Sequence, residues 1–173
     1  MLTEAAKSMP LEISKVIVMD PTENCPAAKM GAEQIVADFK DRSSIKELAE
    51  RSDIITYEIE SGDSTVLKSL ESTCEINPSP ETLRIIQDKL IHKKFLDDNN
   101  IPVAKFSEIS SRGELEEKIN EFGLPVLLKT RRDAYDGRGN FKINSSEHIS
   151  EGLKIFEGKS LMLEEFIDFK MEV

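Results

Sequence analysis

The 173-residue sequence has few of the residues from which metal centres and nucleophilic catalytic sites are built. It has two cysteines, Cys25 and Cys74, and two histidines, His92 and His148. The cysteines are isolated, without a CxxC pair or a neighbouring histidine, which is typical of reduced thiols in a cytosolic protein. Each histidine lies alone on an expected helix. The sequence therefore gives no indication of a metal-ligand cluster or a Ser-His-Asp triad, and we predict a cytoplasmic location.

Long apolar runs and an excess of positive charge are also absent. No apolar run approaches the roughly 18–20 residues that cross a bilayer, and Glu4, Lys7, Pro10 and Glu12 interrupt any secretory pattern near the start. The formal net charge of −10 disfavours nucleic-acid and anionic membrane partners, which usually require a basic face. The hydrophobic fraction of 39% and the charged fraction of 32% are those of a soluble globular protein. We expect neither a nucleic-acid partner nor a membrane partner.

The first 78 residues alternate short apolar strands with helices. We expect a helix at residues 2–7, strands at 16–19, 35–38 and 53–60, and helices starting at residue 44 and spanning 63–69. Ser44 and Glu47 fit a capping box at the start of one helix. Strands that alternate with helices in this way predict parallel βαβ units and an α/β fold.

A proline-rich segment separates this region from the rest of the chain. Asn77-Pro78-Ser79-Pro80 breaks the pattern, so we place one domain at 1–78 and a second at 79–173. Ser79 can cap a helix that runs to about Asp98 with one buried face. Beyond it we expect strands at 103–109, 126–129, 141–143 and 161–166, with helices at about 115–122 and 149–156.

The stretch from Leu127 to Asn140 carries the strongest functional signal. A strand ends at Lys129, a loop with Gly137 and Gly139 follows, and a second strand completes a hairpin. Four cations fall within ten residues of this otherwise acidic chain: Lys129, Arg131, Arg132 and Arg138. Such a concentration of positive charge indicates an anionic ligand, and phosphate fits it best.

Each part of this loop has a plausible role with phosphate. A lysine at the end of a rigid strand could hold the α- and β-phosphates, and glycines let backbone N–H groups approach phosphate oxygens closely. Arg138 could add a bidentate contact. The sequence has no GxxxxGK[ST] motif, so this is not a common P-loop. From these residues alone, a solvent-exposed basic hairpin remains an equal alternative.

Several motifs together resemble one enzyme family. Lys129–Arg131 and Tyr135–Asn140 closely resemble the loop of the ATP-grasp N5-carboxyaminoimidazole ribonucleotide synthetases, which also form the ATP-grasp part of phosphoribosylaminoimidazole carboxylases. Thr56–Glu60 resembles the family's T-x-E-x-E strand end. Similar matches are found at Pro78–Glu81, Gln87–Lys89, and Glu164–Ile167 with Glu172. The match covers nearly the whole chain, and the Tyr-Asp-Gly-Arg-Gly element is its most specific part.

The resemblance implies a fold, a reaction and partners. The fold would be a truncated Rossmann-like pre-ATP-grasp domain at 1–78, followed by an incomplete ATP-grasp domain at 79–173 whose lid spans about 103–165. The family begins with a further strand and glycine-rich turn, and its Mg²⁺-binding acids would lie beyond this chain. The reaction would use ATP and bicarbonate to carboxylate 5-aminoimidazole ribonucleotide in purine biosynthesis, through carboxyphosphate. The intact enzyme would be a homodimer.

The resemblance also implies residue roles. The ATP-binding residues would be Lys89, Lys129, Ala134, Gly137, Gly139, Asn140, Glu164, Glu165, Phe166, Ile167 and Glu172. The catalytic residues near the aminoimidazole nucleotide and the carboxyphosphate would be Tyr135, Asp136 and Arg138. Glu58 would approach the nucleotide substrate, and no residue of the chain is assigned to a metal.

Simpler interpretations remain for some of these residues. Without the resemblance, Lys89 is better explained as a residue that flanks an apolar helix stripe. Glu164 and Glu165 could form an ordinary strand edge, and only one of them can face a given side. Glu58 could lie on a solvated edge. Two alternative functions also remain, an inactive nucleotide-binding ATP-grasp fragment and another purine ATP-grasp ligase such as glycinamide ribonucleotide transformylase.

Overall fold

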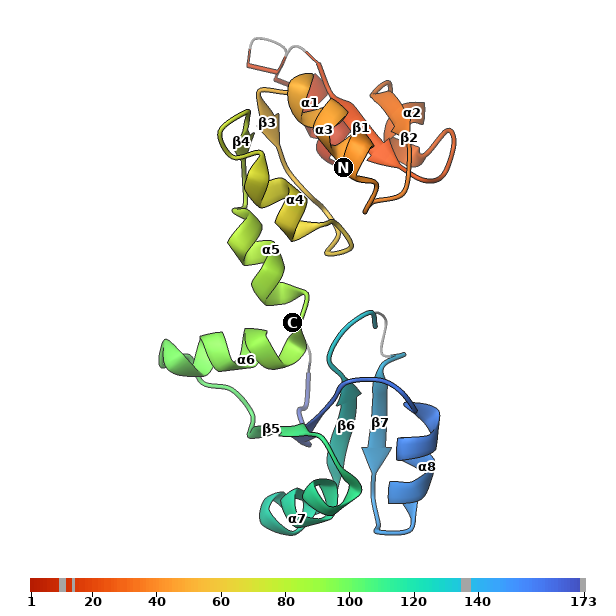
Figure 1. Ribbon diagram of the computed structural model, residues 1–173, viewed down its shortest axis with the longest axis vertical. Coiled ribbons are helices and arrows are strands. Elements are labelled where there is room, and N and C mark those ends of the chain that lie inside the picture. The colour runs from red at the N-terminus through yellow and green to blue at the C-terminus, as the bar shows by residue number, and fades with distance from the viewer. Residues whose placement is uncertain (10–11, 14, 135–137, 172–173) are drawn as a thin grey trace. The chain divides into compact units, whose positions relative to one another are not determined.

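The computed structural model describes residues 1–9, 12–13, 15–134 and 138–171 (Figure 1). The chain divides into two compact units, Met1–Arg84 and Ile85–Val173. Both units combine helices with strands, so the predicted α/β class is confirmed.

The first unit contains two pairs of parallel strands. β1 (Ile17–Asp20) pairs with β2 (Glu33–Val36), and β3 (Ile54–Ile55) pairs with β4 (Glu75–Ile76). The helices are α1 (Leu2–Lys7), α2 (Pro26–Lys29), α3 (Arg42–Glu50) and α4 (Ser64–Ser69). Because α2 joins β1 to β2 and α4 joins β3 to β4, the predicted parallel βαβ units are confirmed.

Two local expectations in the first unit are wrong. The third helix begins at Arg42, because the carboxylate of Asp41 caps it and accepts the Ser44 N–H at 2.8 Å. The strand expected at 53–60 is reduced to Ile54–Ile55. The Asn77 N–H still donates to the Ile55 carbonyl at 2.9 Å, but Pro78 has no N–H with which to continue the pairing.

The second unit contains a four-stranded antiparallel sheet with the order β5-β8-β6-β7. The strands are β5 (Phe106–Ile109), β6 (Val126–Thr130), β7 (Asn140–Ile143) and β8 (Leu161–Glu165). The helices α7 (Arg112–Phe122) and α8 (His148–Ile155) lie between β5 and β6 and between β7 and β8 in the chain. The predicted strands, the two helices and the β6–β7 hairpin are confirmed.

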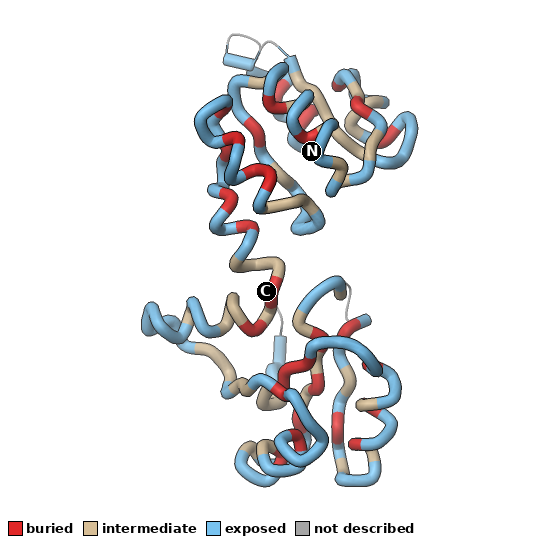
Figure 2. The backbone as a smooth tube through the Cα atoms, viewed as in Figure 1, coloured by how far each residue is buried: buried red, intermediate tan, exposed pale blue. Residues whose placement is uncertain are grey.

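The two faces of this sheet differ chemically, because side chains alternate along each strand. Val126 and Leu128 of β6 are fully buried in a core with Leu115 of α7 and Ile149 of α8. Figure 2 shows buried segments along the strands and helices of the second unit. The alternate residues of β6 and β8, which include Lys129, face the other side. The sequence of one short strand therefore serves both the core and a polar surface.

One helix was expected from residue 79 to about 98, and this expectation is wrong. The segment forms two helices, α5 (Pro80–Ile86) and α6 (Lys89–Asp98). Asp88 lies between them with an extended backbone, and its carboxylate accepts the N–H groups of Leu90 at 3.0 Å and Ile91 at 3.3 Å. The aspartate thus begins a new helix where the apolar stripe alone predicted a continuous one.

Candidate functional site

A carboxylate lies between two ammonium groups on the face of the sheet opposite the core. Glu164 Oε2 of β8 is 3.1 Å from Lys129 Nζ of β6 and 3.3 Å from Lys93 Nζ of α6. The side chains of Glu164, Lys129 and Lys93 are only 12%, 17% and 19% exposed. Both distances allow ion pairing, although Glu164 Oε2 has no hydrogen-bond partner among the described residues. The charges are held by electrostatic attraction, so an incoming anion can compete for the lysines.

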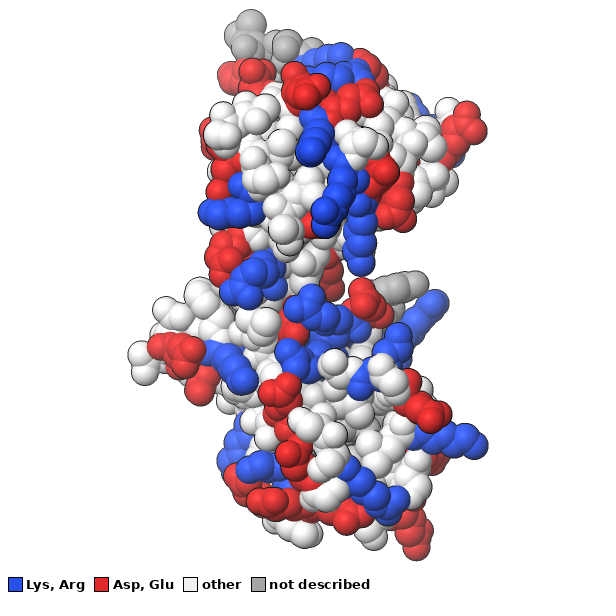
Figure 3. All heavy atoms as spheres, in the orientation of Figure 1, with Lys and Arg blue, Asp and Glu red and all other residues white. Residues whose placement is uncertain are grey.

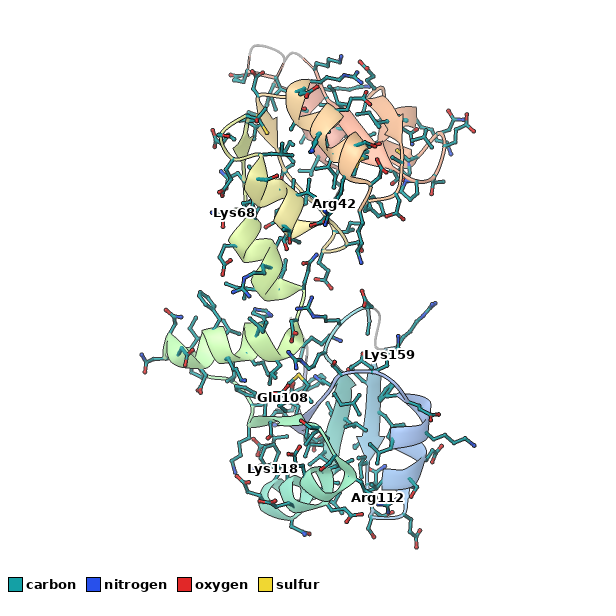
Figure 4. All side chains as sticks on the ribbon, in the orientation of Figure 1. Arg42, Lys68, Glu108, Arg112, Lys118 and Lys159 are labelled. Atoms are coloured by element: carbon teal, nitrogen blue, oxygen red, sulfur yellow. The ribbon has the colours of Figure 1, made fainter. Side chains whose placement is uncertain are left out.

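A second charged cluster joins the start of α6 to the end of β6. Asp88 is 1% exposed, and its Oδ1 and Oδ2 accept from Arg131 Nε at 3.1 Å and Nη2 at 2.7 Å. Arg132 Nε donates to the same Oδ2 at 3.0 Å. The remaining branch of Arg131 donates to Glu108 Oε1 at 2.5 Å, and Figure 4 shows Glu108 extending from β5. Arg131 and Arg132 of the central stretch therefore both pair with the buried Asp88 carboxylate, although the Arg132 side chain is 51% exposed.

The pKa values of Asp88 and Arg131 are shifted toward their charged forms. Burial acts to raise the pKa of Asp88, but hydrogen bonds from Arg131, the Ile91 N–H and Arg132, together with the Arg131 charge, lower it below its ordinary value. The hydrogen bond to Asp88 raises the pKa of Arg131, against the opposing effect of burial. Asp88 therefore remains a carboxylate over the physiological pH range.

The glycine turn closes tightly on the end of β6. A Cβ atom at Gly139 would overlap the Ala134 Cβ and the Thr130 Oγ1, both of which it would approach within 3.0 Å. The Gly139 carbonyl accepts the Thr130 N–H at 2.9 Å. Thr130 Oγ1 is buried and has no hydrogen-bond partner in the part of the chain that the structure describes. Only glycine fits this turn, which returns the chain to Asn140.

The register of the strands places two predicted residues beside each other. Asn140 of β7 is paired with Lys129 of β6, so their side chains share the polar face. Arg138, also predicted for the site, is exposed. Figure 3 shows Lys and Arg side chains gathered over the end of the second unit from which the β6–β7 connection leaves.

The alternation of side chains along β8 places Glu164 and Glu165 on opposite faces of the sheet, a choice that the sequence did not decide. Glu164 faces the lysines, whereas the Glu165 side chain lies on the opposite face, where its Oε2 accepts the Lys105 N–H at 3.3 Å. Phe166 lies under Lys142, whose Nζ is 3.5 Å from the ring centroid, and Ile167 is 49% exposed. Of this group, only the Glu164 side chain joins the charged cluster.

Some predicted site residues cannot be placed with the others. Tyr135, Asp136, Gly137 and Glu172 lie outside the described residues. Glu58 belongs to the first unit, where it is exposed and lies three residues beyond the end of β3. Their roles therefore stay predictions.

Two searches of the described residues give negative findings. Among residues 1–9, 12–13, 15–134 and 138–171, no group of three or more His, Cys, Asp or Glu could hold a metal ion. No helix in the same part of the chain is long and apolar enough to cross a membrane.

The sequence analysis gave no role to Lys93 or Asp88, and it counted Arg131 among the cations for an anionic ligand without anticipating its pairing with Asp88. Lys93 follows Lys89 by four residues, so both lie on one face of α6, and this spacing is a signal that could have been used. Asp88 and Arg131 are 43 residues apart, and no local pattern indicates that they meet. The Lys89 side chain itself is partly buried, and its N–H donates to the Arg131 carbonyl at 2.9 Å.

Comparison with protein families assigns both parts of the chain. Residues 1–87 match the ribonucleotide synthetase pre-ATP-grasp domain, and residues 94–173 match the ATP-grasp domain. The chain therefore belongs to the ribonucleotide synthetases that carry a pre-ATP-grasp domain and an ATP-grasp domain. The fold class predicted from the resemblance is confirmed.

Several proteins similar to this chain are N5-carboxyaminoimidazole ribonucleotide synthases. The Bacillus subtilis synthase is 35% identical over 173 residues, which cover 100% of this chain and 45% of that protein. The Aspergillus clavatus synthase complexed with ATP has a TM-score of 0.89 and 34% identity over 98% of this chain and 45% of its own. The complex of the synthase from the same organism with ADP and 5-aminoimidazole ribonucleotide has a TM-score of 0.87 and 32% identity. That match covers 98% of this chain and 44% of that chain. The resemblance inferred from the sequence is confirmed, and the chain spans less than half the length of these relatives.

Proposed function

We propose that the protein carrying this chain uses ATP and bicarbonate to convert 5-aminoimidazole ribonucleotide into N5-carboxyaminoimidazole ribonucleotide. The observation that carries the proposal is the Lys129–Glu164–Lys93 cluster beside the glycine turn. Relatives with the same fold bind ATP, ADP and 5-aminoimidazole ribonucleotide, according to their structures. The proposal includes purine biosynthesis as the process, a homodimer as the assembly and the cytoplasm as the location.

The charged face suits a triphosphate. ATP brings several negative charges together, and a phosphoryl-transfer site must neutralise and align them. Lys129 lies one residue before the end of β6 and Lys89 begins α6, so both ammonium groups extend from fixed elements. Glu164 pairs with Lys129 at 3.1 Å and so holds the ammonium group on this face of the sheet. We assign the phosphates to Lys89, Lys129 and the turn that contains Gly139.

The rest of the nucleotide is assigned to the strand that follows Glu164. Adenine needs an acceptor for its amino group and an apolar slot, which the backbone and side chains from Glu164 to Ile167 can supply. Glu172 is assigned to the ribose hydroxyls. ATP is expected to bring Mg²⁺, but the described residues offer no group that fits a metal, so we assign no ligand to it.

The chemistry proceeds in two transfers. A bicarbonate oxygen attacks the γ-phosphorus of ATP, the bond to the bridging oxygen breaks, and ADP leaves. The amine of the aminoimidazole nucleotide then attacks the carboxyl carbon of carboxyphosphate, loses a proton and releases phosphate. Because carboxyphosphate decomposes in water, a loop that covers the site has a chemical purpose. We assign this loop to residues 134–140, with Tyr135, Asp136 and Arg138 directed to the second substrate and Glu58 approaching it.

The test is the release of ADP by the full-length natural protein. Release should require both bicarbonate and 5-aminoimidazole ribonucleotide. Lys129→Ala should lower kcat by about 10²–10³, the usual cost of one well-placed charge-stabilising donor. Lys118→Ala is the matched control, because Lys118 pairs with Glu121 on α7 and lies on another element. Unchanged activity in Lys129→Ala, or release that does not depend on the aminoimidazole nucleotide, would contradict the proposal.

A further inference from the structure

We propose that Asp88 is a positioning residue that fixes Lys89 and Lys129 relative to each other for binding the ATP phosphates. This inference rests on the proposed function, because it assigns the phosphates to these two lysines. It concerns a buried residue that lies within the Gln87–Lys89 match but to which the resemblance assigns no role. The reasons lie in the hydrogen bonds, the burial and the charge of the Asp88 carboxylate.

The Asp88 carboxylate already uses its capacity to accept hydrogen bonds. Its Oδ1 accepts from the N–H groups of Leu90 and Ile91 and from Arg131 Nε. Its Oδ2 accepts from Arg131 Nη2 and Arg132 Nε. A carboxylate has about four lone-pair sites, so five donors leave it none for a ligand. Because the group is also buried, it acts on other residues of the protein and does not contact substrate.

These bonds join two elements that carry the lysines. The two N–H contacts fix the first turn of α6, which begins at Lys89. The arginine contacts fix the chain immediately after β6, two residues beyond Lys129. A further bond, from the Lys89 N–H to the Arg131 carbonyl at 2.9 Å, crosses the same junction. The backbones of Lys89 and Lys129 are therefore held by one connected set of hydrogen bonds.

Asp88 also neutralises positive charge where the start of α6 meets the end of β6. Lys89, Lys129, Arg131 and Arg132 are cations close together in the chain or in the fold, and like charges at short range repel. Asp88 and Glu108 neutralise the arginines, so the repulsion that would move the β6 end away from α6 is removed. Without Asp88, Arg131 would lose its bidentate partner, and the side-chain hydrogen bonds that fix Lys89 relative to Lys129 would be lost.

The test separates phosphate binding from general stability. Asp88→Ser keeps a hydroxyl that can cap α6 but removes the partner of both arginines. We expect the Kd for ADP to rise roughly 10- to 100-fold, as a misplacement of about 1 Å typically costs. The Kd for adenosine, which has no phosphate, should stay within about threefold because the adenine contacts do not depend on Asp88. Both constants are measured by calorimetry on the full-length natural protein.

The matched control is Asp63→Ser in the first unit. Asp63 caps α4 with the same geometry, accepting from Thr65 at 2.9 Å and Val66 at 3.0 Å, and it pairs with Arg42 at 3.4 Å. This variant should leave the ratio of the ADP and adenosine constants unchanged. If Asp88→Ser does not fold, Arg131→Lys is used, because lysine keeps the charge but cannot make the two parallel hydrogen bonds of a guanidinium group to Asp88. The same selective loss of affinity for ADP is expected.

Each outcome decides the inference. A selective loss of ADP affinity in Asp88→Ser or Arg131→Lys supports it. An unchanged ratio, or an equal loss for ADP and adenosine, overturns it and leaves the proposed function standing. Failure of the wild-type protein to bind ADP overturns the proposed function, and this inference with it.

Discussion

Adding one methyl group at two glycines of the second unit should have opposite effects on stability. At Gly139 the new Cβ would lie within 3.0 Å of both the Ala134 Cβ and the Thr130 Oγ1. Optimal separations between such atoms are about 3.5–4.0 Å, so the turn must move. At Gly113, in the first turn of α7, the nearest atom is the Ser111 Oγ at 4.0 Å, which is ordinary contact.

The magnitudes follow from these two surroundings. Overpacking a closed site costs about 1–3 kcal/mol, and at Gly139 neither neighbour is the end of a flexible side chain. Gly139→Ala should therefore lower the free energy of unfolding by that amount and weaken the 2.9 Å bond from the Thr130 N–H to the Gly139 carbonyl. Gly113→Ala should raise the free energy of unfolding by about 0.4–1 kcal/mol, because alanine has less backbone freedom to lose.

Urea unfolding followed by circular dichroism measures both changes, and calorimetry with ADP adds the functional result. Gly139→Ala should weaken ADP binding as well as stability, since the turn lies beside Lys129, whereas Gly113→Ala should leave ADP binding unchanged. Equal stabilities of Gly139→Ala and the wild-type protein would refute the steric reasoning. Destabilisation by Gly113→Ala would refute the placement of Gly113 in an open first turn.

Two further predictions concern the carboxylates of Asp88 and Glu164. The pKa of Asp88 is lowered from its ordinary value of 3.8, so its contribution to stability is fully present above that pH and is lost as the pH falls through the folded-state pKa. The free energy of unfolding of Asp88→Asn should therefore fall less steeply below about pH 4 than that of the wild-type protein. Identical acid titrations of the two proteins would contradict this. Glu164→Gln leaves Lys93 and Lys129 without their shared counter-ion, so urea unfolding should show that the free energy of unfolding falls by about 1–3 kcal/mol. An unchanged free energy of unfolding would mean that the Glu164 charge does not stabilise the fold.

Most of the helices and strands were predictable from the sequence, because their periodic patterns are local. The hairpin of β6 and β7 follows from two apolar runs around a glycine-containing turn. The break between α5 and α6 was not predictable in this way. Asp88 interrupts a continuous apolar stripe, and the arginines that hold its carboxylate lie 43 and 44 residues further along the chain.

The charged site was predictable in part. The motif around Lys129 and the resemblance it carries led to Lys129 and Glu164, and these two side chains do meet. The sequence could not decide between Glu164 and Glu165, because the answer depends on the register of β8 against β6. The strand expected at 53–60 shows the same limit, since its length is set by the partner strand and not by its own alternation.

The alternation along β6 also limits how this protein can change during evolution. Val126, Leu128 and Thr130 are buried on one side of a five-residue strand, while Lys129 lies on the other. An insertion or deletion of one residue within the strand would exchange the two sides, placing an ammonium group in the core and apolar groups at the site. New ligand preferences in descendants of this sequence must therefore arise through substitutions at alternate positions or changes in the turn, while the strand keeps its length.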